Sequence, residues 1–147
     1  MAVRGLFADS VLIDARLGTP TLRALLAPDD SLSMSSLFTA AAVEFAITFL
    51  VTVAAFATLV DPRGPKLGGL LVGLAQVAAI LFGFHLTGGC ANPARWFGPA
   101  VWQLTLTLPQ PIRPMGDLSV YLVGPILGAL VGGVFYGLVI LPEVKKK

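Results

Sequence analysis

Three ionisable side chains lie within or beside long apolar stretches, and they are the first candidates for chemistry: Glu44, His85 and Arg95. A charge buried in hydrocarbon is costly, so such residues are functional candidates by default. No nucleophile stands with a base, and no Cys/His spacing indicates a metal or haem site. The single cysteine, Cys90, excludes an internal disulfide. We therefore expect no enzyme activity and no cofactor, and we look instead to binding or transport.

The sequence around Asn92-Pro93-Ala94-Arg95 predicts a helix that begins inside the membrane. A glycine-rich stretch leads into Asn at a capping position and Pro at the first helical position, a strong signature of a helix start. The prolines of Leu108-Pro109-Gln110-Pro111 end any continuation. We therefore predict a pore loop and half-helix over residues 87–103. Exposed backbone at membrane depth is tolerated only where it lines a water-filled cavity or is buried in protein, so the segment indicates a pore or binding cavity.

The composition is that of a membrane protein. Of 147 residues, 56% are apolar and only 12% are charged, whereas a soluble domain has about 25% charged residues. The apolar runs 37–60, 67–86 and 119–141 each approach or exceed the ~20 residues that cross ~30 Å of hydrocarbon. We predict an all-α membrane protein with three transmembrane helices and one re-entrant half-helix. A polar or amphipathic segment, 1–36, precedes this membrane domain, and a basic tail, 143–147, follows it. Nucleic acid is not an expected partner, because no basic patch is interleaved with aromatic residues.

The stretch Leu86-Thr87-Gly88-Gly89-Cys90-Ala91-Asn92-Pro93-Ala94-Arg95, continued by Phe97-Gly98-Pro99-Ala100-Val101, resembles the second pore loop of the aquaporin, or major intrinsic protein, family. Glu44 and Gly124-Pro125-Ile126-Leu127-Gly128-Ala129 also match. The similarity covers roughly residues 30 to 142 and corresponds to the C-terminal half of a family member, with 37–142 as the half-domain. Family members usually carry two such halves as an inverted repeat, whereas this sequence shows one and no internal duplication.

The resemblance implies a role for each residue of the loop. Two half-helices meet at the midplane of a family member, and each offers one Asn to the permeant; here the motif is Asn92, Pro93 and Ala94. The partial positive charge at the start of such a helix disfavours cations, including hydronium. A ladder of carbonyl acceptors leads to that point, supplied here by Gly88, Gly89, Cys90 and Ala91.

The family pattern also implies a selectivity filter and a scaffold. The filter comprises Arg95, Gly89 and Ile80, with a fourth residue from the other half. Glu44 matches a position that accepts hydrogen bonds from the loop backbone. His85 is a candidate gate because histidine changes charge near physiological pH, and the alternative is an interfacial histidine bonded to loop backbone. Cys90 either faces the lumen, as a target for thiol reagents, or is a small packed thiol.

The permeant stays open at this point. Gly89 and Ile80 resemble the filter of plant tonoplast members, some of which pass ammonia or urea, and this favours an aperture wider than one water. Ala100 and Tyr121 are typical of water channels, Leu122 of glycerol channels, and Trp96 of neither. The sequence thus predicts a passive channel for water and small neutral solutes such as ammonia, urea or glycerol.

Three spans cannot enclose a pore, so we expect pairing. One hypothesis is an antiparallel homodimer related by a twofold axis in the membrane plane, within a larger oligomer such as an octamer of half-chains. The alternatives are a pair with a separately encoded N-terminal half and a non-conducting fragment or regulatory subunit. We expect the cell (inner) membrane, with the lysine tail cytoplasmic in a default copy. Positive charges differ little between the two sides, which allows dual topology.

Overall fold

The computed structural model describes residues 11, 18–22, 33–104 and 117–141. Within these residues every element is a helix, and three helices are long and apolar enough to cross a membrane. This confirms the predicted all-α membrane fold. Most of the predicted segment 1–36 and the whole basic tail 143–147 lie outside the described residues.

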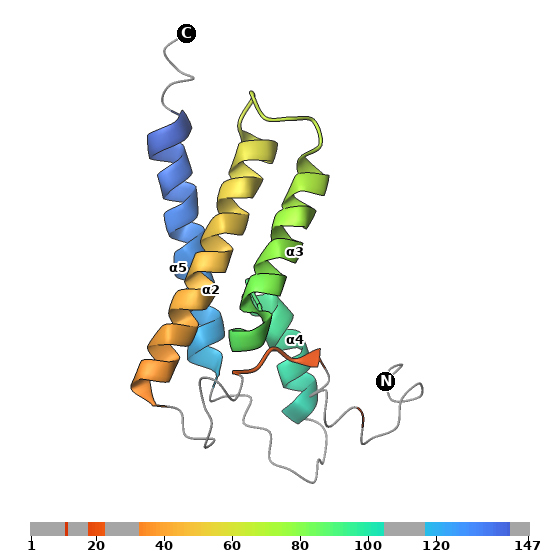
Figure 1. Cartoon of the computed structure of the whole chain (residues 1–147), viewed down its shortest axis with the longest axis vertical. Coiled ribbons are helices and arrows are strands. Elements are labelled where there is room, and N and C mark those ends of the chain that lie inside the picture. Colours follow the sequence, from red (N-terminus) through yellow and green to blue (C-terminus); the bar gives the residue numbers. More distant parts are fainter. Residues whose placement is uncertain (1–10, 12–17, 23–32, 105–116, 142–147) are drawn as a thin grey trace.

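The first span is α2 (Met34–Ala55), which continues into a π-helical end, η3 (Phe56–Val60). The second is α3 (Gly68–Thr87), and the third is α5 (Leu118–Phe135) with its π-helical end η4 (Tyr136–Ile140). Helices α2 and α3 run antiparallel and α5 lies along α2, while the short α4 (Pro93–Leu104) lies near the C-terminal end of α3 (Figure 1). The loop between α3 and α4 therefore stays at one end of the bundle.

Glycines allow α5 to approach α2 closely. A Cβ at Gly124 would come 2.8 Å from the Ala41 oxygen, and one at Gly128 would come 2.4 Å from the Phe45 oxygen. Small residues at such spacing let two backbones meet inside a membrane. The two spaced glycines of α3, Gly69 and Gly73, behave differently, because a Cβ at either would meet nothing within 4 Å. They face space that the described chain does not fill.

Asp61 fastens the turn between α2 and α3 to the end of α5. Its carboxylate accepts hydrogen bonds from the Arg63 backbone N–H (2.9 Å), from Arg63 Nε (3.0 Å) and Nη2 (2.8 Å), and from the Tyr136 hydroxyl (2.8 Å). Arg63 Nη2 also donates to the Ile140 carbonyl at 3.4 Å. The side-chain and backbone hydrogen bonds from Arg63, with that from Tyr136, hold the pKa of Asp61 well below its usual range. The turn and η4 are thus one hydrogen-bonded end of the bundle.

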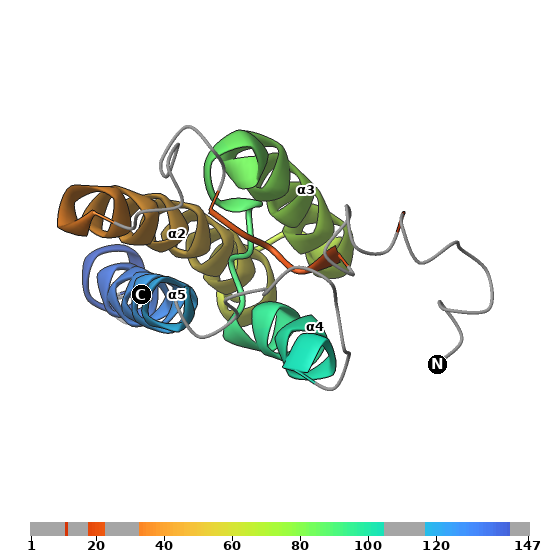
Figure 2. The same cartoon turned by 90° about the horizontal axis from the view of Figure 1, so that it is seen from below.

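Part of the N-terminal segment crosses the opposite end. Residues 18–22 pass between α3 and α4 in the view from below (Figure 2). Thr19 and Pro20 are buried, and Gln103 Nε2 donates to Thr19 Oγ1. A Cβ at Gly88 would come 3.1 Å from the Pro20 Cα. Thr19 and Pro20 are thus packed against α4 and the loop.

Candidate functional site

Glu44 holds the loop that joins α3 to α4. It is fully buried, and its two oxygens accept three hydrogen bonds. Thr87 Oγ1 (2.6 Å) and the Cys90 N–H (2.9 Å) donate to Oε1, and the Ala91 N–H (2.7 Å) donates to Oε2. A charge-assisted bond is roughly twice as strong as a neutral one, so one carboxylate can fix a loop that has no regular secondary structure of its own. Glu44 thus sits where the scaffold role requires it.

Thr87 and Tyr121 extend this anchor, and sequence reasoning did not find the contribution of either. The Gly89 N–H donates to Thr87 Oγ1 at 3.3 Å, while that hydroxyl donates to Glu44. The Tyr121 hydroxyl, on α5, donates to the Thr87 carbonyl at 2.7 Å. The only sequence signal was a threonine at the start of the motif and an aromatic residue in the third span. All three spans therefore hold the loop.

The loop backbone is left-handed at three positions. Gly88 and Gly89 have φ values of 78° and 57°, and Ala91 has 52°. A residue with a Cβ is disfavoured there by roughly 1–2 kcal/mol, and the bond from the Ala91 N–H to Glu44 offsets that cost. At Gly89 a Cβ would also come 2.8 Å from the Ile80 Cα and 2.7 Å from the Ile80 oxygen. A side chain at Gly89 would therefore separate the loop from α3, which is a packing reason for the small residue at this predicted filter position.

Asn92 caps α4 as its sequence pattern indicates. Its Oδ1 accepts from the Ala94 N–H at 2.9 Å, and its carbonyl accepts from the Arg95 N–H at 3.1 Å. The side chain is exposed, and within the described chain its amide nitrogen donates to no acceptor. Because Pro93 has no N–H and Oδ1 satisfies one donor, the start of α4 combines partial positive charge with an amide available to a ligand.

Arg95 lies over the loop carbonyls. Its Nη1 donates to the Gly89 carbonyl at 2.5 Å and to the Cys90 carbonyl at 3.4 Å. No carboxylate of the described residues pairs with it, so the guanidinium is held by backbone while its side chain remains exposed. Because Gly89 contacts both Arg95 and the Ile80 backbone, the structure brings the three predicted filter residues together. The arrangement offers hydrogen-bond donors and a positive charge.

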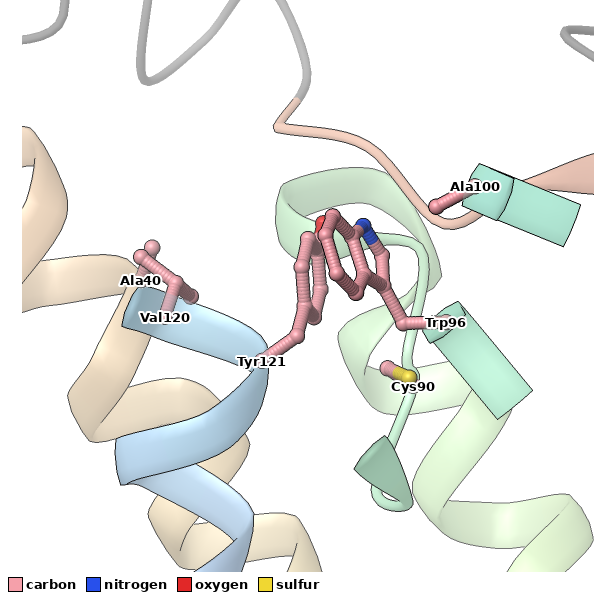
Figure 3. Packing of buried hydrophobic residues seen from close by; sticks show 6 residues of the cluster. All are labelled: Ala40, Cys90, Trp96, Ala100, Val120 and Tyr121. Atoms are coloured by element: carbon pink, nitrogen blue, oxygen red, sulfur yellow. The ribbon is translucent and has the colours of Figure 1, made fainter. Parts of the chain in front are cut away.

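Cys90 is packed rather than open. It is fully buried, its Sγ donates to the Asn92 carbonyl at 3.0 Å, and it lies close to Trp96 (Figure 3). The Trp96 ring stacks on Tyr121 with centroids 5.6 Å apart and an angle of 19° between the planes. Trp96, which fitted no family side-chain pattern, thus packs α4 onto α5. The carbonyl of Cys90 faces Arg95, but its thiol belongs to the core.

His85 stands apart from this cluster. It lies in the last turn of α3, its side chain is exposed, and its ring meets Phe84 edge-on with centroids 5.6 Å apart. It forms no hydrogen bond with loop backbone among the described residues. Nothing in this geometry joins His85 to the filter residues, so a gating role stays a prediction.

Three helices long and apolar enough to span a membrane, with the short α4 that Asn92 caps, define an all-helical integral membrane protein with a polar loop between α3 and α4. The sequence profile of the major intrinsic protein family matches residues 8–136. The chain belongs to this family. The match begins well ahead of the first span, and it therefore takes in the segment that packs on the loop.

Individual relatives agree with the family assignment. The chain is 35% identical to the lens fiber major intrinsic protein of Lithobates pipiens over 112 residues, 75% of this chain and 39% of the relative. It is 39% identical to aquaporin TIP2-1 of Arabidopsis thaliana over 101 residues, 65% of this chain and 36% of the relative. It is also 39% identical to aquaporin TIP4-4 of Zea mays over 100 residues, 64% of this chain and 34% of the relative. The matched part is thus well under half the length of each of these relatives.

Proposed function

We propose that the chain forms a passive membrane channel for water and small neutral solutes, with ammonia, urea and glycerol as candidates beside water. The observation that carries the proposal is the start of α4, where the exposed side chains of Asn92 and Arg95 present hydrogen-bond donors. These donors lie beside the carbonyls of Gly89 and Cys90. A small polar molecule can exchange its hydrogen bonds with water for bonds to these groups. Two of the relatives are named aquaporins, which supports water as one permeant.

Charge favours neutral permeants. The helix start at Pro93 carries partial positive charge, and Arg95 adds a full one that no carboxylate of the described chain neutralises. A cation entering this constriction would lose hydration and meet like charge. Neutral molecules meet only donors and acceptors, so the site has the electrostatics of a channel that excludes cations.

The pore needs a second wall, and we propose that a second copy of this chain supplies it. The side chains of Asn92 and Arg95 are exposed in the described chain. In the proposed pore they lie at membrane depth, where polar groups have to be covered by protein or water. An antiparallel copy would place two Asn92 caps together at the midplane, and such pairs would assemble into a larger oligomer. In the cell (inner) membrane, one copy would place its lysine tail in the cytoplasm, which is the default orientation. The second copy would have the opposite orientation.

Reconstitution tests the proposal. Liposomes containing the purified chain should shrink faster than protein-free liposomes in stopped-flow osmotic experiments, and parallel gradients of glycerol, urea and ammonia identify the permeants. Asn92→Asp and Arg95→Val should change permeability or ion leak, whereas Lys66→Gln, which removes a positive charge at the exposed α2–α3 turn, should not. Permeability no higher than that of protein-free liposomes would overturn the homomeric channel and favour a non-conducting or regulatory subunit that requires a separately encoded half.

A further inference from the structure

Gln76 is the one carboxamide side chain in the three spans, and it lies near the middle of α3. It is partly buried and forms no hydrogen bond with any described residue. Threonines of the first span, such as Thr48 and Thr58, instead donate to carbonyls one turn earlier in their own helix. An amide without partners is costly in hydrocarbon. A group outside the described residues, such as water, a solute or a second chain, therefore has to satisfy this amide.

The helical phase shows which side of α3 carries Gln76. Ile80 follows it by four residues, about one turn, and the open glycines Gly73 and Gly69 precede it on the same side. The neighbouring side, with Ala79 and Gly83, packs against α2, where a Cβ at Gly83 would come 3.3 Å from Ile47 Cδ1. Gln76 thus lies next to the side of α3 that packs on α2. It shares its own side with Gly69 and Gly73, which no described residue covers.

The loop packs on α3 close to the level of Gln76. Gly89 lies directly over the Ile80 backbone, and Ala91 packs with Ile47 and with Ala79, the residue that precedes Ile80 in α3. Asn92 follows Ala91, while Gln76 lies about 6 Å beyond Ile80 along the α3 axis. Because Ala91 packs beside Ala79, which lies about 4.5 Å from Gln76 along that axis, the two amides lie roughly one helical turn apart.

We propose that Gln76 is a lumen residue that helps to set solute specificity, acting as a second amide beside Asn92. This inference rests on the proposed channel function. A carboxamide offers two donors and an acceptor, so a polar neutral solute that leaves the filter meets a further hydrogen-bonding group instead of an apolar wall. Small amides and other solutes that both donate and accept gain most from such a site.

Thiol labelling tests the placement without depending on flow. In proteoliposomes, Gln76→Cys should react with a small water-soluble methanethiosulfonate reagent, read as a mass shift of the protein. Leu74→Cys, on the opposite and exposed side of α3, is the matched control, and the wild type gives the background from buried Cys90. A thiol surrounded by hydrocarbon stays protonated and unreactive, so we expect Gln76→Cys to react at least about tenfold faster than Leu74→Cys. Equal rates would overturn the placement.

Permeability tests the role. Gln76→Leu should lower permeability to the polar solutes that wild type passes by about three- to tenfold, the effect of one hydrogen bond, while Gln76→Asn should stay within about twofold. A Gln76→Leu protein that passes those solutes like wild type would overturn the inference alone. A wild-type protein without permeability would overturn the proposed channel itself, and the labelling result would still report whether Gln76 meets water.

Discussion

Replacing Glu44 by glutamine would show how the pore loop is held. The carboxylate accepts two hydrogen bonds on Oε1, from Thr87 and Cys90, and one on Oε2, from Ala91. A carboxamide of the same shape keeps one acceptor oxygen but presents a donating NH₂ group in place of the other. With its oxygen toward Thr87 and Cys90, the Ala91 N–H would face a donor. The left-handed Ala91 would then lose the bond that offsets its strain.

The expected cost follows from these bonds. Hydrogen bonds to charged groups contribute about 1.5–3 kcal/mol each, against about 1 kcal/mol for neutral ones. Losing one such bond and weakening two others predicts a destabilisation of about 3 kcal/mol for Glu44→Gln. Glu44→Ala leaves all three donors without their acceptor and should cost about 5 kcal/mol or more. The order of the two variants is as diagnostic as the size of either effect.

Hydrogen exchange measured by mass spectrometry on peptides covering residues 86–96 reports this loop directly. If local opening governs exchange, a loss of 3 kcal/mol accelerates it by about a hundredfold. Leu50→Ala, at an exposed position of the same helix, is the control and should leave loop exchange unchanged. Loop exchange in Glu44→Gln within about threefold of wild type would refute the view that the carboxylate anchors the loop.

Arg95→Val should allow cation leak into proteoliposomes loaded with an ion-sensitive dye, whereas Arg95→Lys should not, because it keeps the charge. Gly128→Ala should lower the free energy of unfolding by about 1–3 kcal/mol, because its Cβ would come 2.4 Å from the Phe45 oxygen. Gly137→Ala, whose Cβ would meet nothing within 4 Å, should stay within about 0.5 kcal/mol in the same denaturant titration. The pKa of Asp61 in the folded protein lies below its ordinary value of 3.8. Its contribution to stability is therefore fully present above pH 3.8, and it is lost as the pH falls through the lower, folded-state pKa. Asp61→Asn should therefore unfold at lower temperature than wild type throughout pH 5–8, about the ordinary working range, and the difference should shrink in strong acid.

The spans and the start of the half-helix could be predicted because both depend on local sequence. Hydropathy alone identifies the long uncharged runs as spans. The order of Asn92 and Pro93 specifies a helix cap followed by a first helical residue. The family resemblance then supplied Glu44 as a scaffold, and the structure places its carboxylate within reach of the loop amides. Local pattern and motif were thus enough to indicate which residues surround the loop, while their roles in a pore stay predictions.

Long-range contacts could not be predicted in the same way. The bond between Asp61 and Tyr136 joins residues 75 positions apart, and no local signal marks either side chain as a partner of the other. The close fit of Gly89 on the Ile80 backbone has the same origin. A glycine in a filter position indicates a wide aperture when the sequence is considered alone. Only the packed backbone shows that a larger residue would have no room.

The order in which Glu44 and its partners occur along the chain has a consequence for biosynthesis. The donors follow Glu44 by 43, 46 and 47 residues. At translation rates of about 5–20 residues per second, about 2 to 9 seconds pass between the synthesis of Glu44 and that of its last partner, Ala91. During that interval α2 carries a polar carboxyl group without its hydrogen-bond partners, which is costly in lipid. Substitutions at Thr87 or in the following loop would therefore act first on the yield of inserted protein, before the proposed pairing of two copies.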